Sequence, residues 1–350
     1  MVDTELVTAI RSMPKIDLHR HLEGSLRLET LLSIALEHNI TLPRFDVEGL
    51  RPFVQVMPGE PRSWRRFLGK FQTLRMFYRS EAIIKRVTSE VVADAAADNV
   101  KYMELRFTPQ ALNNLMQCDH AQVVAWVCEA AKATAHANGI RVRLILSMNR
   151  HESVEVGQKV LHAALHNHCD DGVVGIDLAG QEDGYPVHPF RALFEEAKAA
   201  GIGVTIHAGE WAGAESVRAA IEVLAADRIG HGIRIVEDPD LVALIAEREI
   251  ALEVCPTSNV DSGAVARLSE HPLPKLYAQN VKTTINTDDP LVSNITLSEE
   301  LINIITHTSL TLDDIKQHQI IAARAAFMSV TEREALVAQF EQWLYDDPPT

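Results

Sequence analysis

Eight short runs of β-branched and apolar residues recur along the chain, and stretches of helical character separate them. The intervening stretches 190–201, 216–226 and 240–250 are rich in Ala, Leu and Glu at helical spacing. Strands that alternate with helices indicate a parallel sheet, and eight such strands predict a closed (β/α)8 barrel of TIM type. The eight runs cover residues 15–21, 101–107, 141–147, 173–179, 203–208, 228–231, 250–256 and 282–287.

The length of 350 residues is compatible with two domains or with one large barrel, since a domain has about 150 residues on average. No linker rich in Gly, Ser or Pro divides the sequence, and it shows no internal repeat. We therefore predict a single domain over 1–350. Residues 291–350 are expected to form closing helices, with the last five residues as a frayed tail.

Residues 22–100, between the first two runs, exceed what one crossover helix requires, so a helical insertion is predicted there. Within it, Trp64, Phe67, Phe71 and Leu74 recur at helical spacing beside a basic face. Two interpretations are open. This helix either packs on the outside of the barrel or forms a lid over its C-terminal mouth.

Charge and hydropathy narrow the classes of partner. The chain has 33 Lys and Arg against 48 Asp and Glu, and the net charge of −15 has the wrong sign for binding nucleic acid or an anionic membrane surface. No apolar run approaches the ~18 residues of a membrane span, and the N-terminus does not resemble a secretory signal, so a cytoplasmic location is expected. The four cysteines form no CxxC pair, and nothing indicates a macromolecular partner.

Histidines stand at the ends of several predicted strands. His19 and His21 end the first run, and strand alternation points both imidazoles toward the barrel interior. His207 ends the fifth run, His231 ends the sixth, and Asp288 follows the eighth. Because the carboxyl ends of barrel strands meet at one mouth, we expect these side chains to lie close together.

Three imidazoles and one carboxylate, without a thiolate, form a ligand set that suits zinc better than iron, cobalt or manganese. Such an ion lowers the pKa of water from about 15.7 toward about 7, which favours hydrolytic chemistry. Glu210, just past the fifth strand, is expected to stay protonated in a partly dry pocket and to act as an acid. His231 would then serve as a base or orient the water.

Each residue also has a simpler interpretation. His207 and His231 could be hydrogen-bonded core residues, Asp288 a turn cap and Glu210 a first-turn carboxylate. A second HxH pair, at 166–168, is expected at a solvated helix end. The coincidence of five groups at the ends of four strands favours the metal site.

Six motifs, in order over residues 17–290, resemble the adenosine deaminase family of metal-dependent amidohydrolases, its bacterial members in particular. They are HRHLEGSLR, DLAG, HAGE, RIGHG, CPTSN and NTDDP. The resemblance implies one zinc ion per chain and water adding to C6 of the purine, with release of ammonia. The implied zinc ligands are His19, His21, His207 and Asp288.

The resemblance also implies roles around the substrate. Glu210 would donate a proton to purine N1, and His231 would orient or deprotonate the attacking water. Asp289 would hydrogen-bond N7, and the backbone of Gly180 would contact N3. Glu23 stands where adenosine deaminases commonly have Asp, which binds the ribose 5′-hydroxyl; Glu at this position is also similar to adenine and aminodeoxyfutalosine deaminases.

The predicted reaction is hydrolysis of adenosine and 2′-deoxyadenosine to inosine and deoxyinosine, with a small purine nucleoside as the only partner. Other 6-aminopurines are the alternative substrates: adenine, 5′-methylthioadenosine or aminodeoxyfutalosine. An unrelated amidohydrolase and a non-catalytic purine-binding protein are more distant alternatives. Nucleic-acid deaminases need a PCxxC segment, which the sequence lacks. Gln181 replaces an Asp that is usual in the family, and the sequence alone gives no account of its effect.

Overall fold

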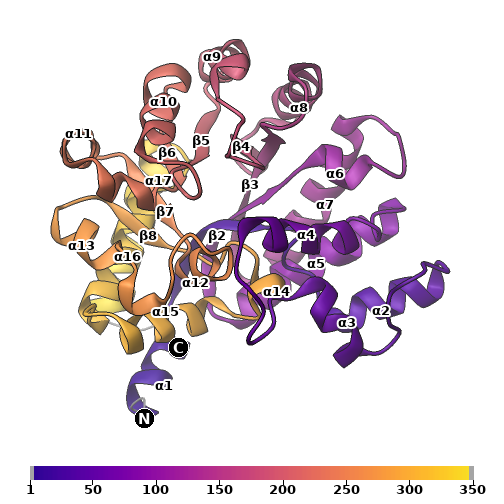
Figure 1. Cartoon of the computed structure of the whole chain (residues 1–350), viewed down its shortest axis with the longest axis horizontal. Coiled ribbons are helices and arrows are strands. Elements are labelled where there is room, and N and C mark those ends of the chain that lie inside the picture. The colour runs from indigo at the N-terminus through magenta and orange to yellow at the C-terminus, as the bar shows by residue number, and fades with distance from the viewer. Residues whose placement is uncertain (1–3, 347–350) are drawn as a thin grey trace.

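The fold is known from a computed structural model, which describes residues 4–346. Eight parallel strands form one sheet in chain order, as Figure 1 shows. The barrel closes where the backbone N–H of His21 donates to Asp288 O at 2.8 Å and the N–H of Asp288 donates to His19 O at 2.8 Å. The predicted barrel is confirmed. Its strands are β1 (Lys15–His21), β2 (Val100–Phe107), β3 (Arg141–Asn149), β4 (Val173–Ala179), β5 (Gly203–Ala208), β6 (Arg228–His231), β7 (Ala251–Val254) and β8 (Thr283–Ile285).

Two strands end earlier than the sequence pattern predicts. β7 ends at Val254 because Pro256, which lacks an N–H, begins helix α12 (Pro256–Asp261). β8 ends at Ile285. The next residue, Asn286, still donates its backbone N–H to Val254 O at 2.9 Å, and its side-chain oxygen accepts from Leu18 N at 2.9 Å.

Helices surround the barrel on its outer face (Figure 1). Besides α12, the helices between β2 and β8 are α6 (Pro109–Asn113), α7 (His120–Asn138), α8 (Val154–Asn167), α9 (Arg191–Ala199), α10 (Ala214–Leu224), α11 (Pro239–Glu247) and α13 (Leu273–Ala278). The same part of the chain contains three short 3-10 helices: η1 (His188–Phe190), η2 (Ile233–Glu237) and η3 (Leu268–Glu270). Before β1 lies α1 (Thr4–Ser12). The 166–168 pair lies at the exposed end of α8, as expected.

The segment between β1 and β2 is helical, with α2 (Leu28–Glu37), α3 (Val47–Val54), α4 (Trp64–Leu74) and α5 (Glu81–Ala97). Ser63 caps α4 by accepting from Arg66 N. Trp64 stacks on Trp211 of the loop after β5, with ring centroids 5.7 Å apart. Because this loop follows a barrel strand at its carboxyl end, α4 lies over the mouth of the barrel rather than on its outer wall. Whether it moves as a lid stays a prediction.

The C-terminal segment contains α14 (Pro290–Ser293), α15 (Leu297–His307), α16 (Leu312–Ala325), α17 (Val330–Glu341) and the turn η4 (Gln342–Asp346). α16 packs across the amino ends of β1 and β8. Gln319 accepts from Ile16 N at 2.7 Å, and His318 bonds the Thr283 hydroxyl at 3.0 Å. Of the tail expected over residues 346–350, Asp346 is the last residue of η4, and residues 347–350 lie outside the described residues.

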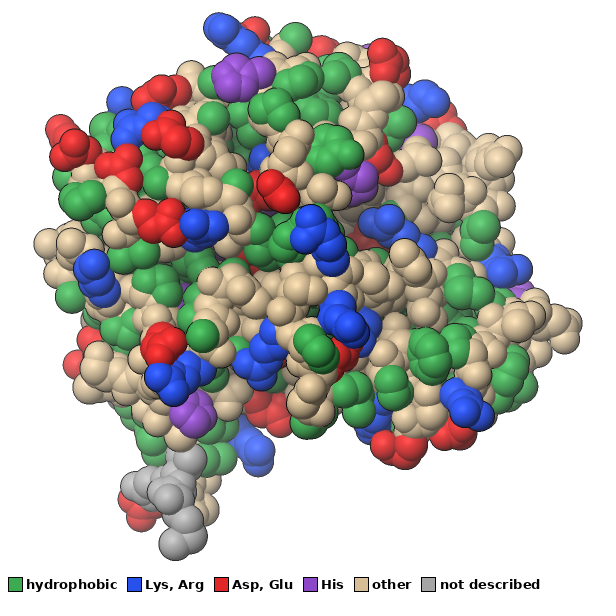
Figure 2. Space-filling model, in the orientation of Figure 1, with side chains coloured by type: hydrophobic (Ala, Val, Ile, Leu, Met, Phe, Trp, Pro, Cys, Tyr) green, Lys and Arg blue, Asp and Glu red, His purple; other side chains and the backbone are tan. Residues whose placement is uncertain are grey.

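The surface in Figure 2 carries interspersed acidic and basic side chains over the face shown. None of the helices within residues 4–346 combines the length and hydrophobicity that crossing a membrane requires. The cytoplasmic location stays a prediction.

Candidate metal centre and substrate pocket

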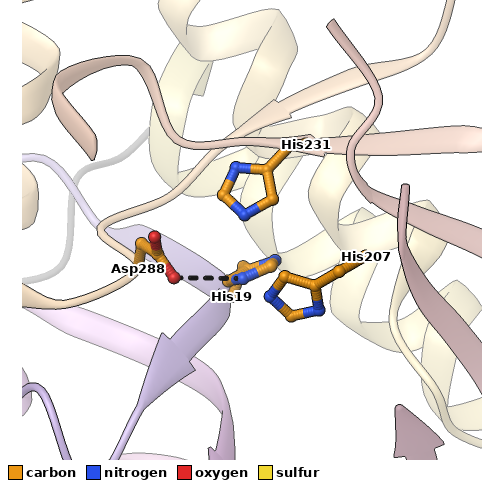
Figure 3. Close-up of side chains that lie close together, drawn as sticks. All are labelled: His19, His207, His231 and Asp288. Atoms are coloured by element: carbon orange, nitrogen blue, oxygen red, sulfur yellow. Dashed lines mark ion pairs between the residues drawn. The ribbon is translucent and has the colours of Figure 1, made fainter. Parts of the chain in front are cut away.

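Four predicted side chains converge at the carboxyl ends of β1, β5 and β6 and just after β8 (Figure 3). His19, His207, His231 and Asp288 are all buried, and each offers a ligand atom within 4.8 Å of the others. His19 Nε2 lies 3.2 Å from Asp288 Oδ1. Groups more than 260 residues apart in sequence therefore meet in one cluster, as the strand-end argument predicts.

His21 borders the same cluster. Its Nε2 lies 3.2 Å from His207 Nε2 and 3.3 Å from Asp288 Oδ1. Strand alternation, which predicts His19 and His21 on one side of β1, agrees with this placement. The cluster therefore holds four imidazoles around one carboxylate, one more imidazole than the predicted ligand set needs.

Two of the imidazoles have a carboxylate behind them. His19 Nδ1 bonds Glu253 Oε2 at 2.9 Å, and His207 Nδ1 bonds Asp177 Oδ1 at 2.9 Å. A carboxylate accepts only, so each Nδ1 carries the proton and each Nε2 offers its lone pair to the cluster. Burial lowers the pKa of His207, which keeps this lone pair available.

Arg106 holds both supporting carboxylates in their charged form. Its guanidinium lies 2.6 Å from Glu253 and 3.5 Å from Asp177, and all three side chains are fully buried. Burial alone would raise the pKa values of both carboxyls, but it is outweighed, by His207 and Arg106 at Asp177 and by Arg106 and Arg228 at Glu253, so both pKa values lie below their usual range. Sequence reasoning missed these residues. Charged residues inside the apolar runs at 173–179 and 250–256 were the signal, since buried charges require partners.

The cluster fits a divalent metal ion. His19 Nε2 is buried with no well-oriented hydrogen-bond partner among the described residues, despite its closeness to Asp288. The Nε2 atoms of His21 and His207 face each other, His21 Nε2 also lies beside Asp288 Oδ1, and burial lowers the pKa of both rings. Nitrogen and oxygen donors without a thiolate are a set that zinc accepts.

Backbone strain accompanies this convergence. His231 and Asp288 both have a φ of 61°, in the left-handed region that side chains other than glycine rarely adopt. Such residues persist where the surrounding structure holds them, and they cluster at functional sites. With this backbone conformation, both side chains point into the cluster (Figure 3).

Glu210 lies beside the cluster in a buried position. Ser262 Oγ donates to its Oε1 at 3.1 Å, and its Oε2 lies 3.5 Å from His231 Nε2. Burial, reinforced by the charges of Asp288 and Glu182, raises the pKa of Glu210 well above its usual value. The surroundings of this carboxyl therefore favour its protonated form, which has a proton to donate.

Glu182 positions the segment that carries Glu210, and sequence reasoning missed it. Its Oε1 accepts from Gly209 N at 2.6 Å, and its Oε2 accepts from the backbone N–H groups of Glu210, Trp211 and Ala212 at 3.2, 2.8 and 2.9 Å. One carboxylate thus organises four consecutive amides. The neighbouring Gln181, the departure from the family pattern, donates from its side chain to Asp183 O and from its backbone N–H to His151 Nδ1, and neither bond belongs to this network.

A cavity of about 490 Å³ opens onto the cluster, a volume typical of small-molecule sites. Helix α4 contributes one wall through Trp64, Phe67 and Phe71. The other predicted site residues line it as well: His21, Glu23, Gly180, His207, Glu210, His231, Asp288 and Asp289.

Two of the acidic residues that line this cavity carry a buried side-chain oxygen without a hydrogen-bond partner among the described residues. Glu23 Oε1 accepts from Thr108 N at 2.8 Å, whereas its Oε2 has no partner among the described residues, and neither has Asp289 Oδ1. A Cβ at Gly24 would lie 1.7 Å from Asp289 Oδ1, so only glycine allows this approach. Buried polar atoms without a protein partner indicate where a ligand or water binds.

An eight-stranded parallel barrel whose strand ends supply histidines and an aspartate defines a metal-dependent hydrolase of the amidohydrolase class. The chain belongs to the adenosine deaminase family, which it matches over residues 14–343. It is 38% identical to an adenosine deaminase of Proteus mirabilis over 337 residues, covering 96% of this chain and 98% of that protein.

Two solved structures show the same fold. One is an amidohydrolase from Burkholderia ambifaria with bound Zn, with a TM-score of 0.89, 27% identity and coverage of 98% of this chain and 94% of that one. The other is an adenine deaminase from Arthrobacter aurescens, with a TM-score of 0.87, 28% identity and coverage of 95% and 99%. The family and the fold expected from the sequence are confirmed.

Proposed function

We propose that this chain is a zinc-dependent hydrolase that converts adenosine and 2′-deoxyadenosine, with one water molecule, into inosine or deoxyinosine and ammonia. The observation that carries this proposal is the Glu210 carboxyl, buried beside a histidine and aspartate cluster at the end of a cavity of nucleoside size, where burial raises its pKa. Full-length similarity to adenosine deaminases supports it.

One zinc ion per chain would be held by His19, His21, His207 and Asp288. When bound, it supplies the Lewis acidity that makes water a sufficient nucleophile near neutral pH. Glu253 and Asp177 keep the two neighbouring imidazoles oriented with their Nε2 atoms toward the ion. Ser258 Oγ, which donates to Asp288 Oδ2 at 2.6 Å, leaves the other carboxylate oxygen for the ion.

Glu210 acts as the general acid. Attack of water at C6 places negative charge on the purine ring, and a proton delivered from Glu210 to N1 neutralises that charge as the C6 centre becomes tetrahedral. The two protons of the attacking water complete the balance: one converts the amino group into ammonia as the C6–N bond breaks and the C6 oxygen becomes a carbonyl, and the other returns to the Glu210 carboxylate. Ser262 and the amides bound to Glu182 hold the carboxyl in place.

Asp289 and Gly180 select the purine. N7 and N3 of a purine accept hydrogen bonds, so the groups facing them must donate. Burial and the neighbouring carboxylates of Asp288 and Glu23 raise the pKa of Asp289 well above its usual value, which makes it a donor to N7. Gly180, with a φ of 82°, offers its backbone N–H to N3; a Cβ there would lie 2.6 Å from His151 Nδ1.

Glu23 favours a nucleoside over a free base. Glu23 lines the cavity and its Oε2 has no partner among the described residues, so this oxygen would accept a hydrogen bond from the ribose 5′-hydroxyl. Adenine has no such hydroxyl. Adenine deamination is nevertheless the second candidate, since the Arthrobacter neighbour is an adenine deaminase.

A substrate panel tests the proposal. Ammonia release is measured from adenosine, 2′-deoxyadenosine, adenine, 5′-methylthioadenosine and aminodeoxyfutalosine, with the zinc content of the same preparation. We expect the highest kcat/KM with adenosine or 2′-deoxyadenosine. Much faster turnover of adenine or of a 5′-modified nucleoside would correct the substrate, and no turnover of any 6-aminopurine by zinc-loaded protein would refute the reaction.

A further inference from the structure

His231 is oriented differently from His19 and His207. No carboxylate lies behind it; instead, its Nδ1 lies 3.1 Å from Asn259 Nδ2, on helix α12. A side-chain amide nitrogen donates and does not accept, whereas the opposite end of the amide accepts. The tautomer of His231 therefore depends on which way round the Asn259 amide is held.

A backbone N–H group fixes that orientation through a second histidine. Leu273 N donates to His271 Nδ1 at 3.1 Å, so this nitrogen is unprotonated and the proton of the ring sits on Nε2. His271 is buried, and burial lowers its pKa to about 3, so the ring is neutral at any pH near 7. His271 thus has a donor at Nε2 only.

The Nε2–H group of His271 contacts the end of the Asn259 amide that faces away from His231. His271 Nε2 lies 3.2 Å from Asn259 Oδ1, and an N–H group requires an acceptor there. The amide oxygen consequently faces His271 and the amide nitrogen faces His231. His231 Nδ1 must then accept, which leaves the proton of the neutral ring on Nε2, the atom that points toward the cluster and lies 3.5 Å from Glu210 Oε2.

We propose that His271 and Asn259 are positioning residues that hold His231 in the Nε2–H tautomer, so that it presents a hydrogen-bond donor to the reaction site instead of a lone pair. His231 in this form is neither a metal ligand nor a general base. It donates to the oxygen of the attacking water and directs the oxygen's lone pair toward C6, a role that rests on the proposed function. His21 is then the third imidazole of the metal site.

His318 provides a matched control. Like His271, it is a buried histidine outside the metal cluster, and it bonds Asp314 O at 2.6 Å and Thr283 Oγ1 at 3.0 Å at the opposite end of the barrel. Its substitution removes an imidazole of the same size and burial without changing any group of the His271–Asn259–His231 chain. Loss of folding stability is therefore separable from loss of positioning.

The variants follow from the direction of the hydrogen bonds. His271→Leu removes the donor to Asn259, whereas His271→Gln restores an N–H group near the position of Nε2. Asn259→Asp replaces the amide by an acceptor and should draw the His231 proton to Nδ1. Because Asn259 also hydrogen-bonds Glu210, this variant is examined by spectroscopy alone.

The first readout is the imidazole ¹⁵N spectrum of zinc-loaded, histidine-labelled protein, in which pyrrole-type and pyridine-type nitrogens are distinct; His231→Gln assigns the signals. We expect a protonated Nε2 on His231 in the wild type and in His271→Gln, and a protonated Nδ1 in Asn259→Asp. A wild-type His231 with its proton on Nδ1, or an unchanged tautomer in Asn259→Asp, overturns the proposal. This readout does not depend on turnover and stands even if adenosine is not the substrate.

The second readout separates kcat from KM. We expect His271→Leu to lower kcat by about tenfold or more, since loss of one fixed donor at a reacting oxygen costs about 100- to 1000-fold in comparable sites. KM and zinc content should stay within about twofold, His271→Gln should recover most of kcat, and His318→Leu should keep wild-type kcat at a lower melting temperature. Equal kcat in His271→Leu and wild type, or an equal loss in His318→Leu, contradicts a positioning role.

Discussion

Glu210 illustrates how the surroundings of one residue set its chemistry. Burial of its carboxyl and the nearby acidic groups raise its pKa, whereas the hydrogen bond from Ser262 lowers it. We expect Glu210→Gln, which keeps the shape but has no acidic proton, to lower kcat by at least about 100-fold. Zinc content, measured on the same protein, should not change because Glu210 is not a ligand. Substantial turnover with zinc retained would remove Glu210 from the mechanism.

Glu23 is the residue that should distinguish nucleoside from base. In Glu23→Gln the amide oxygen can still accept from Thr108 N, but an NH₂ group replaces the acceptor Oε2, which has no partner among the described residues. A hydrogen bond to a charged group contributes ~1.5 kcal/mol or more, so kcat/KM for adenosine should fall by about tenfold. Adenine, which lacks the hydroxyl, is the internal control. An equal loss for both substrates would argue against contact between Glu23 and the ribose.

At the level of single residues, the sequence predicts the groups that touch the reaction but not those that support them. His19, His207 and Asp288 lie at the carboxyl ends of predicted strands. Because these ends all meet at the mouth of the barrel, the sequence position of each residue predicts where it lies in the structure. Glu182 could not be found in this way, because its role depends on four amides that come from another strand's loop. The tautomer of His231 depends likewise on His271, and no local sequence pattern predicts that His271 lies beside Asn259.

Among the structural elements, α16 gives a prediction for pH. Burial lowers the pKa of His318 from 6.5 to about 4, so between these pH values the unfolded chain binds a proton that the folded chain does not. Stability is therefore lost as pH falls from 6.5 toward 4, by about 3 kcal/mol from this residue. Urea unfolding at pH 7 and 4.5 should show a smaller loss for His318→Gln than for wild type. Parallel losses would show that His318 does not titrate in this way.

The sequence predicts the elements of the barrel closely because periodicity is a local property. All eight strands lie where the apolar runs predict them, and their ends differ from the prediction by at most two residues. β3 extends further, to Asn149, whereas β7 ends before Pro256 and β8 ends at Ile285. The side of the barrel on which α4 packs was not predictable. The apolar face that includes Trp64 indicates that the helix packs against another part of the protein, but it does not indicate which part. The stack of Trp64 on Trp211 shows that this part is the mouth of the barrel.

For the whole molecule, metal binding should be linked to folding. The proposed ligands come from β1, β5 and the segment after β8. An ion held by them therefore links the first strand of the barrel to the last, and it binds only the folded chain. A ligand at a thousandfold excess over its Kd adds about 4 kcal/mol of stability. We expect chelation to lower the melting temperature by several degrees and zinc to restore it. A melting temperature insensitive to both would mean that no ion is bound at the cluster.

The most direct test of the account is a zinc titration of metal-depleted protein with adenosine as substrate. Zinc is added in measured steps, and the initial rate of ammonia release is recorded with the amount of inosine formed. The account predicts no turnover without metal, a rate that rises with each addition and saturates at one zinc per chain, and one inosine for each ammonia. Full activity in the absence of metal, or no conversion of adenosine at any zinc content, would contradict it.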